Sequence, residues 1–87
     1  MNNKILIKLY VPYCDKYFDF LIPVNELVWK TSNLIARLVN EISNIDYDEN
    51  SKYILVNMLT NEIYPSNISI YDTNIRNATE LLLIKVK

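Results

Sequence analysis

Glycine and histidine are both absent from this chain of 87 residues, and cysteine occurs once. Without glycine the sequence cannot contain a P-loop, a dinucleotide-binding fingerprint or a nucleophile elbow, because each of these motifs needs glycine at fixed positions. Without histidine, most catalytic triads, most proton shuttles near neutral pH and most zinc sites are also excluded. Turns that need a positive φ angle must use another residue type, and asparagine is the best substitute.

Neither sign of charge is in large excess, since the net charge is −1. Nucleic acids and anionic lipids both attract basic surfaces, so neither is expected as a partner. No apolar run approaches the ~20 residues of a membrane-spanning helix, and the short apolar stretch after Lys4 does not fit a signal peptide. Cys14 has no second cysteine with which to form a disulfide. These features predict a cytoplasmic protein without direct membrane insertion.

The residues that are present favour one folded domain over residues 1–87. The sequence is 51% hydrophobic and 22% charged, which is typical of a globular chain. A chain of this length has room for one sheet and one helix around a shared core, but a deep catalytic cleft would not fit easily. No nucleophile paired with a base is recognisable, so we expect no enzymatic activity and no cofactor.

Two segments near the N-terminus alternate apolar and polar residues with a period of two, which is the pattern of a half-buried strand. The first segment runs from Lys4 to Val11, and the second runs from Tyr17 to Val24. The proline-led stretch 12–16 between them suits a hairpin turn. Cys14 lies in this stretch and is expected to be an ordinary turn residue.

Apolar residues then recur at helical spacing, which predicts an amphipathic helix over about 30–43. Asn40 falls on the polar outer face of this helix, and residues 31–33 are plausible capping types. Trp29 then precedes the helix, where it would either cap the core or stand exposed as a binding anchor. The acidic loop 44–51 follows; it lacks the glycine and the terminal glutamate of a calcium loop, so no metal site is expected.

Three further strands are predicted at 52–58, 62–64 and 81–86. The order is therefore β-β-α-β-β-β, an α+β fold in which one helix packs on one face of a mixed sheet. Val56 and Leu83 are expected on the helix-facing side of that sheet.

The C-terminal third carries a more specific pattern. Ile70 is followed by Asp72 two positions later and by Ile75 three positions after that, and then by a polar turn and the last strand. This spacing resembles the end of ubiquitin-like domains. The resemblance implies a β-grasp fold in which the two isoleucines fill the bottom of the core, and Asp72 accepts backbone N–H bonds within its turn.

The front half is similar to the YukD-type small accessory proteins of type VII (WXG100) secretion systems in Gram-positive bacteria. The similar segments are 17–24, which reads Tyr-Phe-Asp-Phe-Leu-Ile-Pro-Val, and 31–39, which reads Thr-Ser-Asn-Leu-Ile-Ala-Arg-Leu-Val. The resemblance implies a non-catalytic, protein-binding accessory or regulatory component that binds another part of the secretion machinery. The chain departs from these relatives before the last strand, where Asn77 stands in place of a frequent glycine.

The last predicted strand is apolar on both faces. Because one face packs on the helix, the other face remains open, and ubiquitin-like domains usually bind proteins there. A contiguous exposed apolar area is uncommon on monomers, although scattered surface hydrophobes are the ordinary alternative. The predicted protein-binding residues are Leu6, Lys8, Leu55, Leu82, Ile84 and Val86.

Two other functions remain open at this point. A ubiquitin-like modifier or sulfur carrier needs a C-terminal Gly-Gly, and the sequence ends Lys85-Val86-Lys87 instead, which disfavours conjugation. A structural homodimer could form through an edge strand. The expected oligomeric state is therefore a monomer or a weak homodimer.

Overall fold

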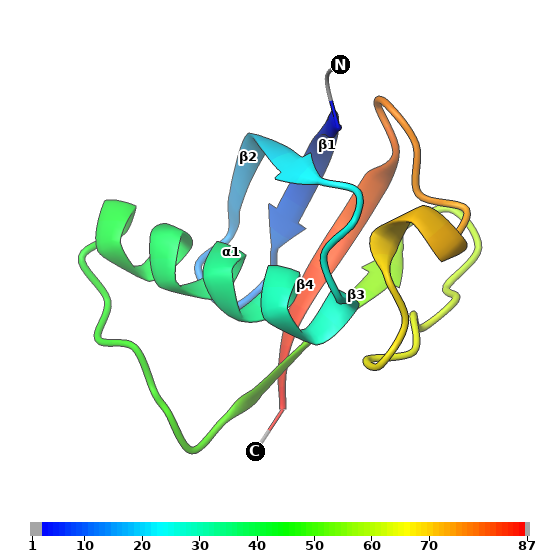
Figure 1. Ribbon diagram of the computed structural model, residues 1–87. Helices are drawn as coiled ribbons and strands as arrows, with labels where there is room; N and C mark the ends of the chain where they lie inside the picture. Colours follow the sequence, from blue (N-terminus) through cyan, green and yellow to red (C-terminus); the bar gives the residue numbers. More distant parts are fainter. Residues whose placement is uncertain (1–2, 87) are drawn as a thin grey trace.

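The computed structural model describes residues 3–86, which form a two-layer α+β fold with one helix on a four-stranded sheet (Figure 1). The sheet order is β2-β1-β4-β3, in which β1 and β4 are parallel and the other neighbours are antiparallel. The predicted α+β class with a single helix is confirmed. The elements are β1 (Lys4–Val11), β2 (Lys16–Pro23), α1 (Val28–Ile42), β3 (Lys52–Asn57), the 3-10 helix η1 (Ile70–Asp72) and β4 (Glu80–Val86).

Within residues 3–86 the sheet has four strands and not the predicted five. Ile63, from the segment expected to be a strand, forms only an isolated bridge with Val56. Two backbone bonds flank that bridge, from Asn57 N to Glu62 O at 2.8 Å and from Tyr64 N to Leu55 O at 3.0 Å. Pro65 follows Tyr64 and has no N–H group to extend the ladder. The segment therefore leaves the edge of β3 after these two bonds.

Helix α1 begins earlier than its polar residues indicate. Thr31 and Ser32 lie inside the helix instead of capping it, and their hydroxyls donate to backbone carbonyl oxygens of the preceding turn. The first N–H groups of the helix are satisfied by a distant segment, with Val28 N donating to Ile68 O at 2.8 Å. A helix start that is satisfied by remote backbone leaves no capping signal in the local sequence.

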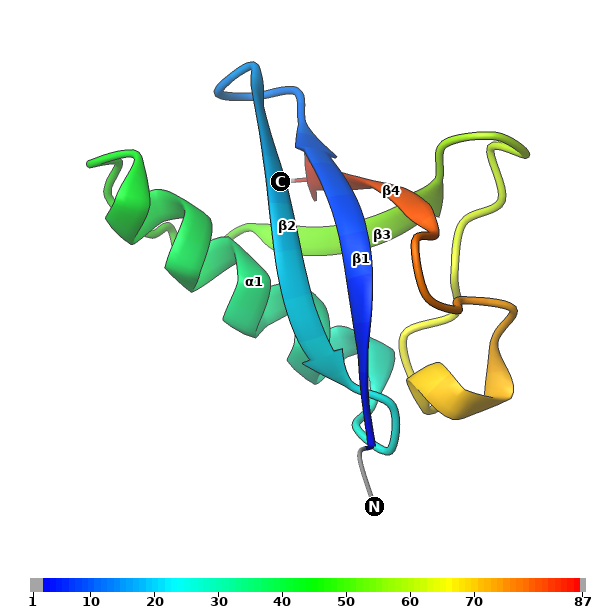
Figure 2. The same cartoon turned by 90° about the horizontal axis from the view of Figure 1, so that it is seen from above.

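The core lies between α1 and the sheet, and Figure 2 shows α1 on one side of the sheet only. On the sheet side, Leu9 of β1 and Leu83 of β4 are almost completely buried. On the helix side, Ile35, Ala36 and Val39 are buried to the same degree. Burial of this kind contributes roughly 25 cal/mol for each Å² of apolar surface removed from water, so these contacts supply most of the driving force for folding.

Strand β3 presents the opposite face from the one predicted. Leu55 pairs with Leu83, and both are 0% exposed in the core beneath α1. Val56 pairs with Leu82 on the other face of the sheet. The expected positions of Leu55 on the open face and of Val56 on the helix face are therefore wrong. The strand has three consecutive apolar residues, Ile54, Leu55 and Val56, so the sequence pattern could not decide which of them face the helix. The pairing of β3 with β4 decides it.

Asn40 is 2% exposed, and its expected place on the polar outer face of the helix is wrong. Its Oδ1 accepts a hydrogen bond from the Tyr13 hydroxyl at 2.6 Å, and its Nδ2 donates to Asp46 O at 3.3 Å. The hairpin turn and the loop after α1 thus fold over the C-terminal end of the helix. Burial, together with the neighbouring Tyr53, raises the pKa of Tyr13 to about 12.

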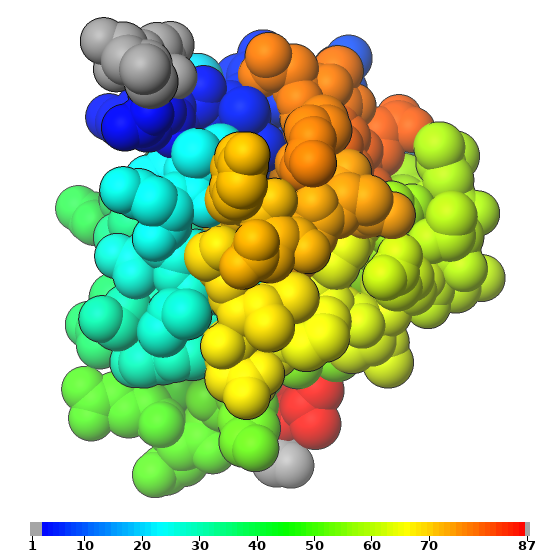
Figure 3. Space-filling model, turned by 45° about the vertical axis from the view of Figure 1, so that its right-hand side comes forward, coloured from blue at the N-terminus to red at the C-terminus, as the bar shows by residue number. Residues whose placement is uncertain are grey.

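The segment around η1 closes one end of the core. Ile70 and Ile75 are 0% and 1% exposed, so their predicted role in the core is confirmed. Among the described residues, the Asp72 carboxylate accepts only from the Ser69 hydroxyl, at 3.2 Å, so the expected bonds to backbone N–H groups are wrong. Figure 3 shows this segment, in yellow and orange, lying against the chain before α1, in cyan. The contact includes a backbone bond from Ile70 N to Glu26 O at 2.9 Å.

Four residues of the described chain adopt positive φ angles without glycine. Asn44 and Asn61 take two of these positions, as the composition predicts, and Asp15 takes a third. Ala78 takes the fourth, with φ of 69°. Its backbone is held in the turn before β4 because Ala78 N donates to Leu6 O at 2.7 Å. A side chain with a Cβ costs about 1–2 kcal/mol in this conformation.

Replacement of Ala78 by glycine is expected to raise the free energy of unfolding by about 1 kcal/mol, because glycine adopts positive φ without the Cβ clash. Denaturant unfolding followed by circular dichroism measures the change. The chain offers one other alanine as a control: Ala36→Gly inside α1 should lower stability by about 1 kcal/mol or more. A loss of stability in Ala78→Gly would contradict the expected strain at this turn.

Candidate protein-binding surface

The candidate site is the face of the sheet opposite α1, which we call the open face. Side chains alternate between the two faces of a strand, so the even-numbered residues of β1 and β4 point to the open face. The register between the strands aligns these residues in rows that run across the sheet.

A charged row crosses the middle of the open face. Lys8 lies opposite Asp19 of β2 on one side and Glu80 of β4 on the other. Directly opposed side chains in such a row have Cβ atoms about 5 Å apart. Next to the charged row, Leu6 lies opposite Leu21, and these two side chains are 40% and 63% exposed. The charged row therefore has an apolar border on one side.

An aromatic row borders the charged row on its other side. Tyr10 lies opposite Tyr17 of β2 and Leu82 of β4, and Leu82 lies opposite Val56. The two tyrosine rings are 4.6 Å apart between centroids with an interplanar angle of 37°. The Tyr10 hydroxyl donates to Asp15 Oδ1 at 2.6 Å, and this bond raises the pKa of Tyr10. Tyr10 is therefore held in place, whereas Tyr17 is 76% exposed.

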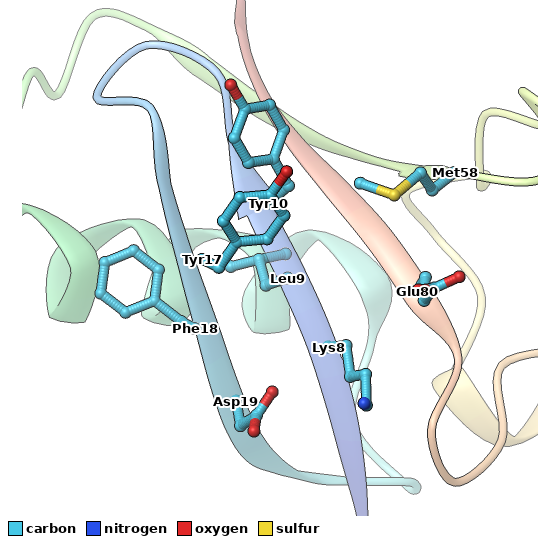
Figure 4. A pocket seen from close by; sticks show the side chains of 8 residues that line it. All are labelled: Lys8, Leu9, Tyr10, Tyr17, Phe18, Asp19, Met58 and Glu80. Carbon is cyan, nitrogen blue, oxygen red and sulfur yellow. The ribbon is translucent and has the colours of Figure 1, made fainter.

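A groove of about 290 Å³ runs between the charged row and the aromatic row (Figure 4). Figure 4 shows Lys8 between Asp19 and Glu80, with the two tyrosine rings close together above them, and with Phe18 pointing away from the groove. Met58 closes one end, beyond β4. The lining side chains on the open face are Lys8, Tyr10, Tyr17, Asp19, Met58 and Glu80.

Five of the six residues predicted for protein binding share the open face. They are Leu6, Lys8, Leu82, Ile84 and Val86. Leu55 does not belong to this surface because it is buried on the other side, and Ile54, opposite Ile84, takes its place. Leu82 and Ile84 are half-buried, so the apolar part of the surface is shallow.

The sequence prediction missed most of the groove. Tyr10 could have been included, because it shares a face with Leu6 and Lys8 by simple alternation. Tyr17 and Glu80 could not be assigned, since their places beside Lys8 depend on the register with β2 and β4.

A second exposed apolar surface lies on α1. Leu34, Leu38 and Ile42 follow one another at intervals of four residues and are 50%, 37% and 63% exposed. Trp29 is also a residue of α1 and not a core cap, since it is 44% exposed with Lys30 Nζ 5.6 Å from its ring centroid. The structure therefore offers a helix surface with which the open face can be compared by experiment.

Other kinds of site find little support in the described part of the chain. No group of three histidine, cysteine, aspartate or glutamate residues between positions 3 and 86 is arranged to hold a metal ion. No helix in this range is long and apolar enough to span a membrane. Cys14 is half-buried, and its thiol lies 3.8 Å from Val11 O.

Structural comparison identifies a ubiquitin-like fold that matches the EccD ubiquitin-like domains of ESX type VII secretion systems. The EccD5 ubiquitin-like domain from Mycobacterium xenopi has a TM-score of 0.78 and 10% identity, covering 99% of this chain and 98% of that one. The ubiquitin-like domain of Mycobacterium tuberculosis EccD1 has a TM-score of 0.72 and 10% identity, with 97% and 99% covered. A chain of the MycP5-free ESX-5 inner membrane complex has a TM-score of 0.80 and 9% identity. The match covers 98% of this chain but only 21% of that one.

The same fold occurs in other settings. A chain in the toluene 4-monooxygenase HD complex has a TM-score of 0.76 and 6% identity, with 92% of this chain and 95% of that chain covered. No protein family and no curated protein matches by sequence. Identities this low establish the fold, and the role must be argued from the surface of this chain.

Proposed function

We propose that this chain is a non-catalytic, protein-binding domain that serves as an accessory or regulatory component of a type VII secretion system in the cytoplasm. The observation that carries the proposal is the open face, which no helix or strand of the described residues covers (Figure 2). The likeness to EccD ubiquitin-like domains and to a chain of the ESX-5 inner membrane complex supports a partner within the secretion machinery.

A binding role suits the chemistry of the open face better than catalysis does. The groove contains carboxylates, a lysine and tyrosines, and the chain has no histidine to act as a base near neutral pH. Apolar residues on both sides of the groove provide the area that a protein partner needs to bury. Leu6 and Leu21 border it on one side, and the half-buried Leu82 and Ile84 extend the surface on the other.

Site-specific cross-linking in cells tests this proposal. A photoreactive amino acid at Leu6 on the open face is expected to form a covalent adduct with a component of the type VII secretion machinery, identified by mass spectrometry. The same group at Leu34 on α1 is the matched control, because the two positions are 40% and 50% exposed. Adduct formation from Leu34 in place of Leu6 would contradict docking through the open face.

The double replacement of Leu82 and Ile84 by aspartate is expected to weaken capture of that component by about tenfold or more, since a charge in the centre of an interface must be desolvated. Leu34 and Leu38, both to aspartate, form the control pair. Because Leu82 and Ile84 are half-buried in a central strand, melting curves must show that the variant is folded. The more exposed pair Leu6→Asp and Leu21→Asp gives the same test at a lower cost in stability.

A structural homodimer is the second candidate, and the free edge of β2 favours it. The register leaves the backbone N–H groups of Tyr17, Asp19 and Leu21 pointing away from β1, where they can bond to another strand. In the cross-linking experiment, an adduct between two copies of this chain would support the homodimer and count against the proposed partner.

A further inference from the structure

The charged row of the open face holds opposite charges that do not form ion pairs with one another. Asp19 and Glu80 are the cross-strand neighbours of Lys8. Among residues 3–86 no ion pair joins Lys8 to either carboxylate, whereas Lys85 and Asp48 approach to 3.9 Å elsewhere in the fold. The carboxylate oxygens of the row are therefore available to a donor from outside the chain.

The groove beside this row carries a surplus of negative charge. Asp19 and Glu80 both line the groove beside Lys8, so two carboxylates flank a single ammonium group. A cation entering the groove meets acceptors on both sides, whereas an anion would be repelled by both carboxylates. The charge of the groove thus complements a basic side chain.

The tyrosine pair narrows the choice among basic side chains. Tyr10 is anchored through Asp15, and Tyr17 lies with its ring centroid 4.6 Å from that of Tyr10. A planar guanidinium can stack on an aromatic face and donate two parallel hydrogen bonds to a carboxylate at the same time. A lysine ammonium is more strongly hydrated and cannot make the bidentate contact. The tyrosine rings beside the carboxylates therefore favour an arginine side chain over a lysine side chain.

We infer that the groove binds an arginine side chain of the protein partner. The guanidinium stacks against Tyr17 and bonds to Glu80 or Asp19, and the aliphatic neighbours of that arginine lie on Leu6 and Leu82. This inference rests on the proposed function, because both place the partner on the open face.

Titration of the isotopically labelled chain with N-acetyl-arginine methylamide, followed by NMR, tests the inference. The backbone amide signals of residues lining the groove are expected to shift, and those of the exposed helix surface are expected to remain in place. The citrulline analogue has nearly the same shape without the charge. It is expected to bind about three- to fivefold more weakly, as befits the loss of an exposed ion pair. Equal binding of the two probes would overturn the inference.

Two matched variants distinguish binding of the arginine probe in the groove from general electrostatic attraction to the acidic residues of the chain. Glu80→Gln and Glu49→Gln each remove one negative charge, but Glu49 is exposed in the loop before β3, outside the groove. Glu80→Gln is expected to weaken binding of the arginine probe by about three- to fivefold, whereas Glu49→Gln leaves it unchanged. Equal weakening by both variants would overturn the inference.

The outcomes of the two proposals remain distinguishable. If the arginine probe fails to shift the groove signals while Leu6 still cross-links to the secretion machinery, the arginine inference falls and the proposed function stands. Binding of the arginine probe without any cross-link from the open face supports the groove and overturns the proposed partner.

Discussion

Truncation of Leu55 to alanine is expected to lower the free energy of unfolding by about 3 kcal/mol, because it removes a fully buried side chain and leaves a cavity under α1. Leu55 is 0% exposed and lies in the core beside Leu83. A domain of this size has a total stability of about 5–10 kcal/mol, so the variant should lose a large part of its resistance to denaturant. Chemical denaturation monitored by circular dichroism or tryptophan fluorescence provides the measurement.

The neighbouring residue serves as the control. Ile54 points to the open face and is half-buried, so Ile54→Ala is expected to cost about 1 kcal/mol or less. The two variants together show which face of the sheet each residue of β3 occupies, because a shift of the strand by one residue would exchange the two effects. A cost for Ile54→Ala equal to or greater than that for Leu55→Ala would contradict the register between β3 and β4.

Replacement of Asn57 by alanine is expected to lower the free energy of unfolding by about 2–3 kcal/mol, because three hydrogen bonds to a buried amide are lost at about 1 kcal/mol each. Asn57 is 8% exposed. Its Oδ1 accepts from Leu59 N at 2.9 Å and from Thr60 N at 3.1 Å, and its Nδ2 donates to the Tyr64 hydroxyl at 2.9 Å. The amide therefore holds both the turn after β3 and the segment that bridges back to it.

The same variant is expected to affect the groove, because Met58 begins the turn that Asn57 organises. NMR signals of Met58 should broaden or shift in Asn57→Ala, while denaturant unfolding measures the loss of stability. Asn67→Ala is the matched control, since Asn67 is exposed in a loop, and its replacement should change stability by less than about 0.5 kcal/mol. Similar losses for both variants would show that the amide network around Asn57 is not what holds this turn.

The sequence alone predicted those features that depend on local pattern. The strict alternation of Lys4–Val11 placed Leu6 and Lys8 on one face, and the structure agrees. The resemblance of the segment around Ile70 and Ile75 to ubiquitin-like domains implied two core residues far from the regular strands, and both are buried. Leu82, Ile84 and Val86 were assigned to the open face correctly, since they alternate with leucines that pack against the one α-helix of residues 3–86.

The prediction failed where several assignments satisfy the same local pattern. Three consecutive apolar residues in β3 left its phase undecided, so Leu55 was placed on the wrong face. Asn40 looked like a surface residue because its hydrogen-bond partners, Tyr13 and Asp46, come from other segments of the chain. A burial state that is set by remote partners cannot be read from the helix itself.

The sequence by itself determined the α+β class with one helix, as residues 3–86 show, and a last strand that is apolar on both faces. Only the tertiary structure decided which side chains meet on the open face. Alternation fixes the relative faces of residues within one strand, but the distance between residues of different strands depends on register. The meeting of Asp19, Lys8 and Glu80 beside two tyrosines is a product of that register, and so is the groove.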